Sequence, residues 1–245
     1  MEHSDRGWHS HVNNYCERAD ASFWAEPVNA FSNGAFLIAA LAAFLIWRRA
    51  GRDDVPALLL IGVIAVIGVG SFLFHTFANR WSLLADVLPI TVFIYGYFFL
   101  AMRRFAGLGI VAASLATLAF LGFNAGFVSA WTGLFGTGPI ATANGSIGYF
   151  PAALAIIGVG ALLKAQAGRA LVGAVEAPAR AGSELFTAAG VFALSLFFRA
   201  IDEAVCDAFP LGTHFMWHVL NAVVLFLLVR AAIRYRAALS GAAAR

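Results

Sequence analysis

Seven long runs of apolar residues, separated by short polar stretches, dominate the chain. A helix needs about 20 apolar residues to cross a bilayer, and each run is close to that length. We place the predicted helices near residues 27–47, 56–76, 83–102, 107–130, 146–163, 184–204 and 213–233. A Gly-, Thr- and Pro-rich stretch at 132–145 leaves the C-terminal boundary of the fourth predicted helix uncertain. The pattern predicts an all-α membrane protein, built as a single seven-transmembrane helix bundle.

The composition agrees with a membrane protein. Of the 245 residues, 61% are apolar and only 12% are charged, whereas about 25% are charged in a typical soluble domain. The basic residues behind the net charge of +3 are spread between the apolar runs, so the sequence indicates no nucleic-acid partner. Residues 1–26 lack the pattern of a cleavable signal peptide, and no protein partner is indicated.

The basic residues also predict an orientation. Twelve of the 16 Lys and Arg residues follow the first, third, fifth and seventh runs. Because Lys and Arg favour cytoplasmic loops, we expect the N terminus outside and the C terminus in the cytoplasm. We divide the chain into an extracytoplasmic N-terminal loop (1–26), a transmembrane domain (27–235) and a cytoplasmic tail (236–245). The inner loop at 164–183 is expected to be long and mobile.

Three histidines stand at the outer ends of predicted helices. His75 lies at the end of the second run, and His214 and His218 open the seventh. The last two are four residues apart, so both rings can reach one metal ion. Three histidines leave the fourth position open, as in catalytic zinc sites. The spacing therefore favours a zinc site, with hydrogen bonding of the three histidines between neighbouring helices as the alternative.

Two further polar residues flank these histidines. Ser71 precedes His75 by four residues and shares its helix face, and Asp86 stands near the start of the returning helix. Polar groups at membrane depth usually have a function. Beside a metal ion, a carboxylate can accept and return a proton, and a hydroxyl can donate to an oxyanion. This chemistry suits hydrolysis of an amide or ester in a membrane lipid, near the outer leaflet.

The N-terminal loop is rich in oxygen ligands of the kind that calcium prefers. These are Asn13, Asn14, Glu17, Asp20 and Glu26. From the residues alone, a solvated, helix-capping loop is the favoured interpretation. His3, His9 and His11 are expected to be solvent-exposed rather than to bind zinc.

Other polar residues carry weaker expectations. Cys16 and Cys206 both fall on the outer side, where an oxidising compartment would permit a disulfide, with two free thiols as the alternative. Polar residues of the first helix share one face and are expected to point into the bundle, namely Asn29, Ser32 and Asn33. An outer charged cluster is expected to form ion pairs, namely Arg199, Asp202, Glu203 and Asp207.

Three separated motifs together resemble the alkaline ceramidases, which belong to a superfamily of seven-span hydrolases that includes the adiponectin receptors. They are YCER with FWAEPVNAFSN, GSFLFH followed by Asp86, and HFMWH. The resemblance covers the chain from Asn13 to about residue 235 and implies a seven-helix bundle with an external or luminal N terminus. It implies the zinc ligands His75, His214 and His218, a catalytic Asp86, a serine near the metal at Ser71 and a Cys16–Cys206 disulfide.

The resemblance also implies a calcium site in the N-terminal loop. Glu17 and Glu26 are the clearest matches to its ligands. Asparagine stands where an aspartate is usual, and Asp20 can supply a ligand in compensation.

The leading hypothesis is a zinc-dependent lipid amidase of ceramidase type, which cuts ceramide to a sphingoid base and a fatty acid. An enzyme for another acyl lipid, such as an N-acylated amino-acid lipid or a phospholipid, fits the same chemistry. A receptor or sensor with structural zinc is a third reading, although the short inner loops offer little to a signalling partner. A retinal-binding bundle is disfavoured because the sole lysine, Lys164, lies at the inner membrane boundary.

Overall fold

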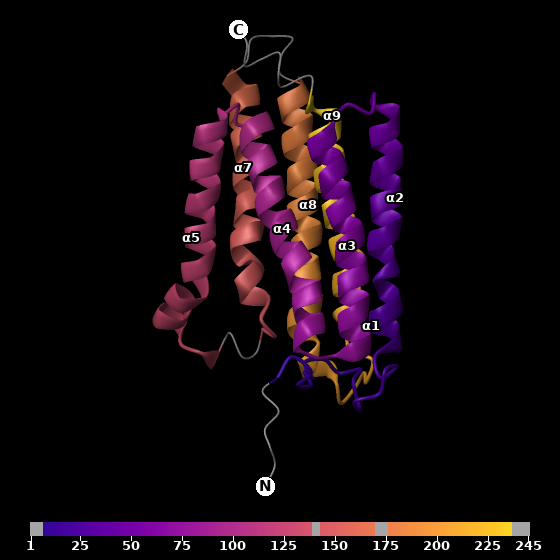
Figure 1. Cartoon of the computed structure of the whole chain (residues 1–245). Coiled ribbons are helices and arrows are strands. Elements are labelled where there is room, and N and C mark those ends of the chain that lie inside the picture. Colours follow the sequence, from indigo (N-terminus) through magenta and orange to yellow (C-terminus); the bar gives the residue numbers. More distant parts are fainter. Residues whose placement is uncertain (1–6, 139–142, 170–175, 237–245) are drawn as a thin grey trace.

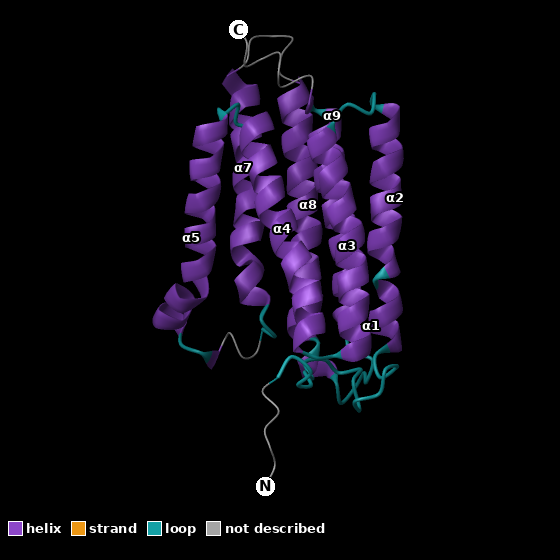
Figure 2. Ribbon diagram, viewed as in Figure 1, coloured by secondary structure: helices purple, strands orange, loops and turns teal. Residues whose placement is uncertain are grey.

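The computed structural model describes residues 7–138, 143–169 and 176–236. Seven helical spans in these ranges are long and apolar enough to cross a membrane, as the hydropathy pattern predicts. The first span consists of α1 (Pro27–Ser32) and α2 (Gly34–Arg49), which are separated at Asn33. The others are α3 (Val55–Phe77), α4 (Arg80–Arg104), α5 (Ile110–Phe135), η1 with α7 (Ser146–Tyr149 and Phe150–Arg169), α8 (Glu176–Ile201) and α9 (His214–Arg234). Within the described ranges the bundle is all-helical, and its loops lie at the two ends (Figure 2).

The prediction of a long loop at 164–183 is wrong, because helices occupy most of this range. α7 continues to Arg169, and α8 begins at Glu176. Pro178 is tolerated in the first turn of α8, where its missing N–H would have no partner, and Arg180 pairs with Glu176 at 2.9 Å. The helix ends therefore run beyond the apolar residues. His3, residues 170–175 and the predicted tail from 237 onward lie outside the described residues.

The seven spans differ in how deeply they are buried. α9 is the most enclosed, with 61% of its most apolar stretch buried, whereas only 6% of that stretch is buried in α5. α5 lies at the edge of the bundle in Figure 1, and its buried residues are Ala113 and Phe120. The core is formed mainly by apolar side chains of α2, α3, α4, α7, α8 and α9.

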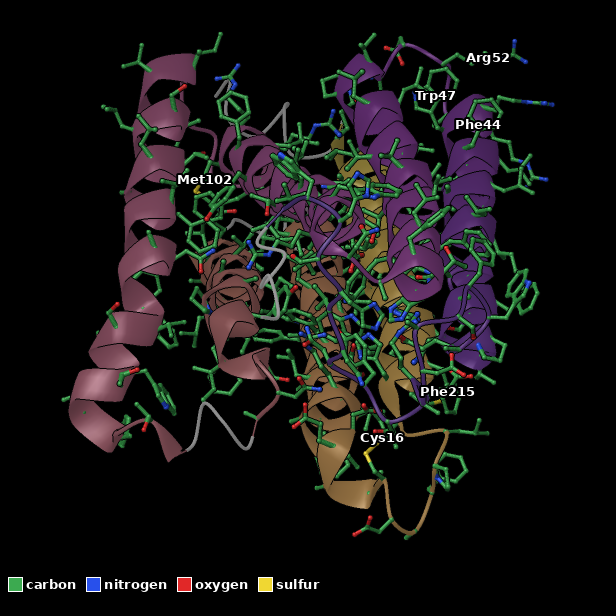
Figure 3. All side chains as sticks on the ribbon, turned by 60° about the horizontal axis from the view of Figure 1, so that its bottom comes forward. Cys16, Phe44, Trp47, Arg52, Met102 and Phe215 are labelled. Carbon is green, nitrogen blue, oxygen red and sulfur yellow. A yellow bond between two sulfur atoms is a disulfide. The ribbon has the colours of Figure 1, made fainter. Side chains whose placement is uncertain are left out.

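The N-terminal loop is fastened to the turn that precedes α9. Cys16 and Cys206 form a disulfide across 190 residues of chain, and Figure 3 shows Cys16 beside this turn. Asp202 supports the same junction, since its carboxylate accepts hydrogen bonds from the backbone N–H groups of Cys16 and His214. This loop and turn cover the end of the bundle at which α3 ends and α9 begins.

Candidate metal centre and active site

The three histidines singled out in the sequence come together at this end of the bundle. His75 lies in the last turn of α3, and His214 and His218 lie in the first two turns of α9. Each offers a ring nitrogen within 4.8 Å of those of the other two. All three side chains are buried, with exposed fractions of 0%, 2% and 1% respectively. The arrangement places three nitrogen ligands around one point inside the protein.

A buried carboxylate fixes the ring of His75. Its Nδ1 donates to Glu26 Oε2 over 2.5 Å, and Arg18 in turn binds the other oxygen of Glu26. With the proton on Nδ1, the lone pair of Nε2 is free to bind a metal, and carboxylate partners of this kind raise the basicity of a histidine ligand. Glu26 therefore acts on the site through His75.

The polar stripe of the first span supplies the partner of His218. Ser32 Oγ donates to the backbone carbonyl of Asn29 at 2.8 Å, so it can accept from His218 Nδ1, which lies 2.7 Å away. The Nε2 of His218 is then also left with a lone pair. Asn29 and Asn33 are buried, which confirms that this face of the span points into the bundle.

His214 is held by its backbone and by ring stacking. Asp202 accepts from the N–H of His214 at 2.9 Å and of Thr213 at 2.6 Å, and so caps the N terminus of α9. The ring of Tyr15 stacks on His214 with 3.7 Å between centroids. Burial raises the pKa of Tyr15 to about 12, so its hydroxyl stays protonated.

The three histidines fit a metal ion. His75 Nε2 and His214 Nδ1 are buried, and neither has a hydrogen-bond partner among the described residues. Unsatisfied buried nitrogens are rare in native proteins and call for an explanation such as an ion. A set of three imidazoles is a ligand set of catalytic zinc. The two orphaned nitrogens thus favour a metal over hydrogen bonding between helices.

Ser71 and Asp86 lie next to this group. Asp86 is close enough to interact with both the Ser71 hydroxyl and His75, and its Oδ1 is buried without a hydrogen-bond partner in the described part of the chain. Gly70 makes this approach of α3 and α4 possible. A Cβ on Gly70 would overlap the carbonyl oxygen of Ala85 and lie 2.7 Å from its carbonyl carbon. The residues that meet in this contact are the neighbours of Ser71 and Asp86.

Replacing Gly70 by alanine is therefore expected to force α3 and α4 apart. We expect a loss of stability of about 1–3 kcal/mol, typical of overpacking, and a fall in any activity of about 100-fold, since displacements near 1 Å can have that effect. Thermal unfolding in detergent and an activity assay measure both. Gly62→Ala is the matched control on the same helix, because its added Cβ meets no atom of another helix within 4 Å. Equal behaviour of the two variants would contradict this role of Gly70.

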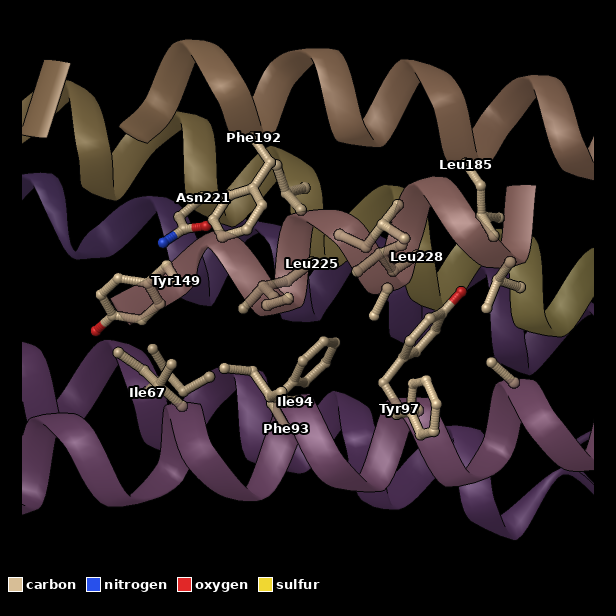
Figure 4. Close-up of a pocket in the computed structure, with 18 of the residues that line it drawn as sticks. Ile67, Phe93, Ile94, Tyr97, Tyr149, Leu185, Phe192, Asn221, Leu225 and Leu228 are labelled. Atoms are coloured by element: carbon tan, nitrogen blue, oxygen red, sulfur yellow. The ribbon is translucent and has the colours of Figure 1, made fainter. Parts of the chain in front are cut away.

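An apolar cavity begins one helical turn below these residues. Its lining includes Ile67, Ile90 and Asn221, which lie one turn from Ser71, Asp86 and His218 respectively. In Figure 4, Ile67 and Phe93 face Tyr149 and Leu225 across the cavity. It encloses about 70 Å³, so a lipid chain can enter only if the lining side chains move.

The expected ion pairs of the outer charged cluster are absent from the described residues, and that prediction is wrong. Asp202 caps α9 instead. Arg199 lies against aromatic rings, with its guanidinium carbon 5.9 Å from the centroid of Tyr15, 5.6 Å from Tyr149 and 5.2 Å from Trp217. Its Nη1 donates to the Tyr15 hydroxyl at 3.1 Å, but its Nε is buried without a partner in the described chain. Arg199 is also close enough to Asp86 to interact with it electrostatically.

The acidic residues considered as calcium ligands do not form a cluster like that of the three histidines. Among the described residues, the set of three or more His, Cys, Asp or Glu side chains whose ligand atoms all lie within 4.8 Å of one another is the histidine triad. Glu17 and Glu26 are buried, whereas Asn14 and Asp20 are exposed. Burial raises the pKa of Glu17, while hydrogen bonds from the N–H groups of Asn29 and Val28 oppose this shift. His9 and His11 are exposed, as expected.

Fold and site together define a seven-span helical protein with a buried three-histidine group beside a serine and an aspartate. A family model described as Ceramidase matches residues 9–244, which is almost the whole chain. The chain therefore belongs to the ceramidase family, and membership implies a membrane-associated amidohydrolase. No curated protein matches the chain.

Proposed function

We propose that the protein is a zinc-dependent lipid amide hydrolase that cuts ceramide into a sphingoid base and a fatty acid. The observation that carries this proposal is the convergence of three buried histidines, two with orphaned nitrogens, next to Ser71 and Asp86. His75, His214 and His218 would hold the ion. When bound, zinc would polarise the amide carbonyl and lower the pKa of a water to about 7.

The protein groups supply the remaining chemistry. Asp86 accepts a proton from the attacking water and returns it to the leaving amine nitrogen. Ser71 donates a hydrogen bond to the carbonyl oxygen as negative charge develops there, a contact worth roughly 3–4 kcal/mol where it has been measured in other enzymes. The apolar cavity below them receives a hydrocarbon chain of the substrate.

We place this site near the extracytoplasmic leaflet, with the N terminus outside. Basic residues cluster at the opposite end, in the last turns of three spans, namely Arg48, Arg49, Arg103, Arg104 and Arg234. Because Lys and Arg favour the cytoplasmic side, this asymmetry supports the orientation. In this orientation the triad lies at the outer end of the bundle, where the amide bond of a lipid, close to its headgroup, can reach it.

The direct test is product analysis with purified protein and ceramide. We expect equal amounts of sphingoid base and fatty acid, about one zinc per chain, loss of hydrolysis with a zinc chelator and recovery on adding zinc. Hydrolysis by metal-free protein would exclude the proposed mechanism. A zinc-bound protein that hydrolyses no acyl lipid would favour the receptor or sensor function.

A second candidate function is the hydrolysis of an acyl lipid amide with an anionic headgroup, such as an N-acyl amino acid. Arg199 favours it. Arg199 is half-buried, and charged groups that leave water are normally paired. It nevertheless forms no salt bridge within the described residues. Its Nε is buried without a partner and the guanidinium interacts electrostatically with Asp86, so Arg199 can meet a negative group of the substrate.

A pair of matched substrates tests this candidate, an N-acylglycine and the corresponding neutral N-acylglycinamide. If Arg199 binds the carboxylate, we expect a preference for the acid of about 10–100-fold, since a hydrogen bond to a charged group contributes about 1.5–3 kcal/mol. Arg199→Gln should remove the preference, whereas Arg180→Gln, on the exposed surface, should retain it. Equal rates for the two substrates in the unmodified protein would exclude an anionic headgroup and leave ceramide.

A further inference from the structure

The guanidinium of Arg18, a residue of the N-terminal loop, lies at the centre of a shell of oxygen atoms. Its side chain is fully buried, with an exposed fraction of 0%. Its Nε binds the Glu26 carboxylate, Nη1 donates to the carbonyls of Asp20 and Ser22 at 3.2 and 3.3 Å, and Nη2 donates to the carbonyl of His75 at 3.0 Å. The shell thus consists of one carboxylate and three backbone carbonyls.

These are the oxygen types that a calcium ion takes as ligands. Here the positive charge is supplied by the chain itself. Both oxygens of Glu26 are engaged, one by Arg18 and the other by His75 and Asn29. Both oxygens of Glu17 accept from backbone N–H groups, at 2.6 Å from Val28 and 2.8 Å from Asn29.

The residues of the loop therefore do not fit the calcium ion that the family resemblance implies. A divalent ion at Glu26 would lie beside the guanidinium of Arg18. Both side chains are buried, and the repulsion between like charges is stronger in the protein interior than in water. The Asp20 carboxylate does not belong to this shell, since its side chain is exposed and its Oδ1 accepts from the N–H of Ser22 at 2.7 Å, while its backbone carbonyl binds Arg18.

We propose that Arg18 is the resident cation of this shell, that the protein needs no calcium, and that Arg18 positions the first metal ligand. Arg18 binds both the backbone carbonyl of His75 and the carboxylate that orients the His75 ring. Through its bond to the His75 carbonyl, Arg18 links the N-terminal loop to the end of α3. The proposal that Arg18 positions His75 as a metal ligand rests on the proposed metal site. The proposal that the protein needs no calcium does not, because it concerns the N-terminal loop alone.

The first experiment measures calcium in the unmodified, zinc-loaded protein. We expect no bound calcium by elemental analysis. We also expect the same unfolding temperature in a calcium-selective chelator and in about 5 mM calcium, which exceeds the dissociation constants of weak protein sites. About one calcium per chain, or a saturable rise in unfolding temperature with calcium, would overturn the proposal. Neither readout depends on hydrolysis, so an inactive protein leaves this result interpretable.

The second experiment measures zinc affinity by competition with a chromogenic chelator. Arg18→Ala is expected to weaken zinc binding about 10–100-fold, as for other residues that orient a metal ligand. Arg104→Ala is the matched control, since Arg104 also binds a buried carboxylate, Asp54, and a backbone carbonyl, that of Ala232, at the other end of the bundle. Both variants should unfold at lower temperature, but only Arg18→Ala should lose zinc affinity.

Equal zinc affinity in Arg18→Ala and the unmodified protein would overturn the positioning role. An unmodified protein that holds no zinc would overturn it together with the proposed metal site. If Arg18→Ala does not fold, Arg18→Lys takes its place, because lysine keeps the positive charge but lacks the planar, multiple-donor guanidinium. We expect Arg18→Lys to bind zinc more weakly than the unmodified protein, by less than the roughly 10–100-fold expected for Arg18→Ala. Full zinc affinity in the lysine variant would then contradict the need for the guanidinium.

Discussion

Protein carrying His75→Ala is expected to contain almost no zinc and to lose at least about 100-fold in hydrolysis, since even the outer partners of metal ligands contribute 10–100-fold. The reason is geometric. His75 is the only ligand of the triad on α3, and without it the two histidines of α9 form an incomplete site. Elemental analysis and product release measure the two effects.

His9→Ala is the matched control for this substitution. His9 is an exposed histidine of the N-terminal loop and does not belong to the triad. It should leave both zinc content and hydrolysis unchanged. Retention of one zinc and of normal hydrolysis by His75→Ala would rule out the three-histidine site.

Asp86→Asn is expected to lower hydrolysis by about 10²–10⁴-fold, the range typical of general acid–base groups. The amide has nearly the same shape as the carboxylate but cannot accept the proton of the attacking water. Zinc content should stay the same, because Asp86 is not one of the three ligands. This separation of metal binding from activity distinguishes Asp86→Asn from His75→Ala.

Asp207→Asn provides the comparison, because Asp207 is an exposed aspartate of the turn before α9. It should hydrolyse lipid at the normal rate. If Asp86→Asn did the same, Asp86 would have no part in proton transfer. If it lost zinc, its role would be structural.

The sequence was informative wherever a function depends on residue type and local spacing. Apolar runs predicted all seven spans, and the separation of His214 and His218 by four residues placed two ring nitrogens on one helix face. The prediction that His75 joins them needed the topology as well, since α3 and α9 are far apart in the chain. The polar ends of helices were missed, because Glu176 and Arg180 interrupt the apolar pattern while continuing the helix.

The contacts that support the site could not be predicted in this way. Asp202 caps a helix that begins twelve residues later, and Ser32 meets a histidine 186 residues away. Such partners are common residue types without a local signature, and only the folded bundle brings them together. The glycine at position 70 has the same limitation, since its role depends on which backbone lies opposite.

α5 packs loosely against the rest of the bundle, which bears on how a lipid could reach a site enclosed by the helices. Few of its side chains are buried, yet Phe120 of α5 lines the apolar cavity. Displacing this helix sideways into the bilayer would therefore sacrifice less packing than moving α9. For a hydrocarbon chain approaching from the bilayer, a shift of α5 would open the apolar cavity at a smaller loss of packing than a shift of α9, and it would leave His214 and His218 in place.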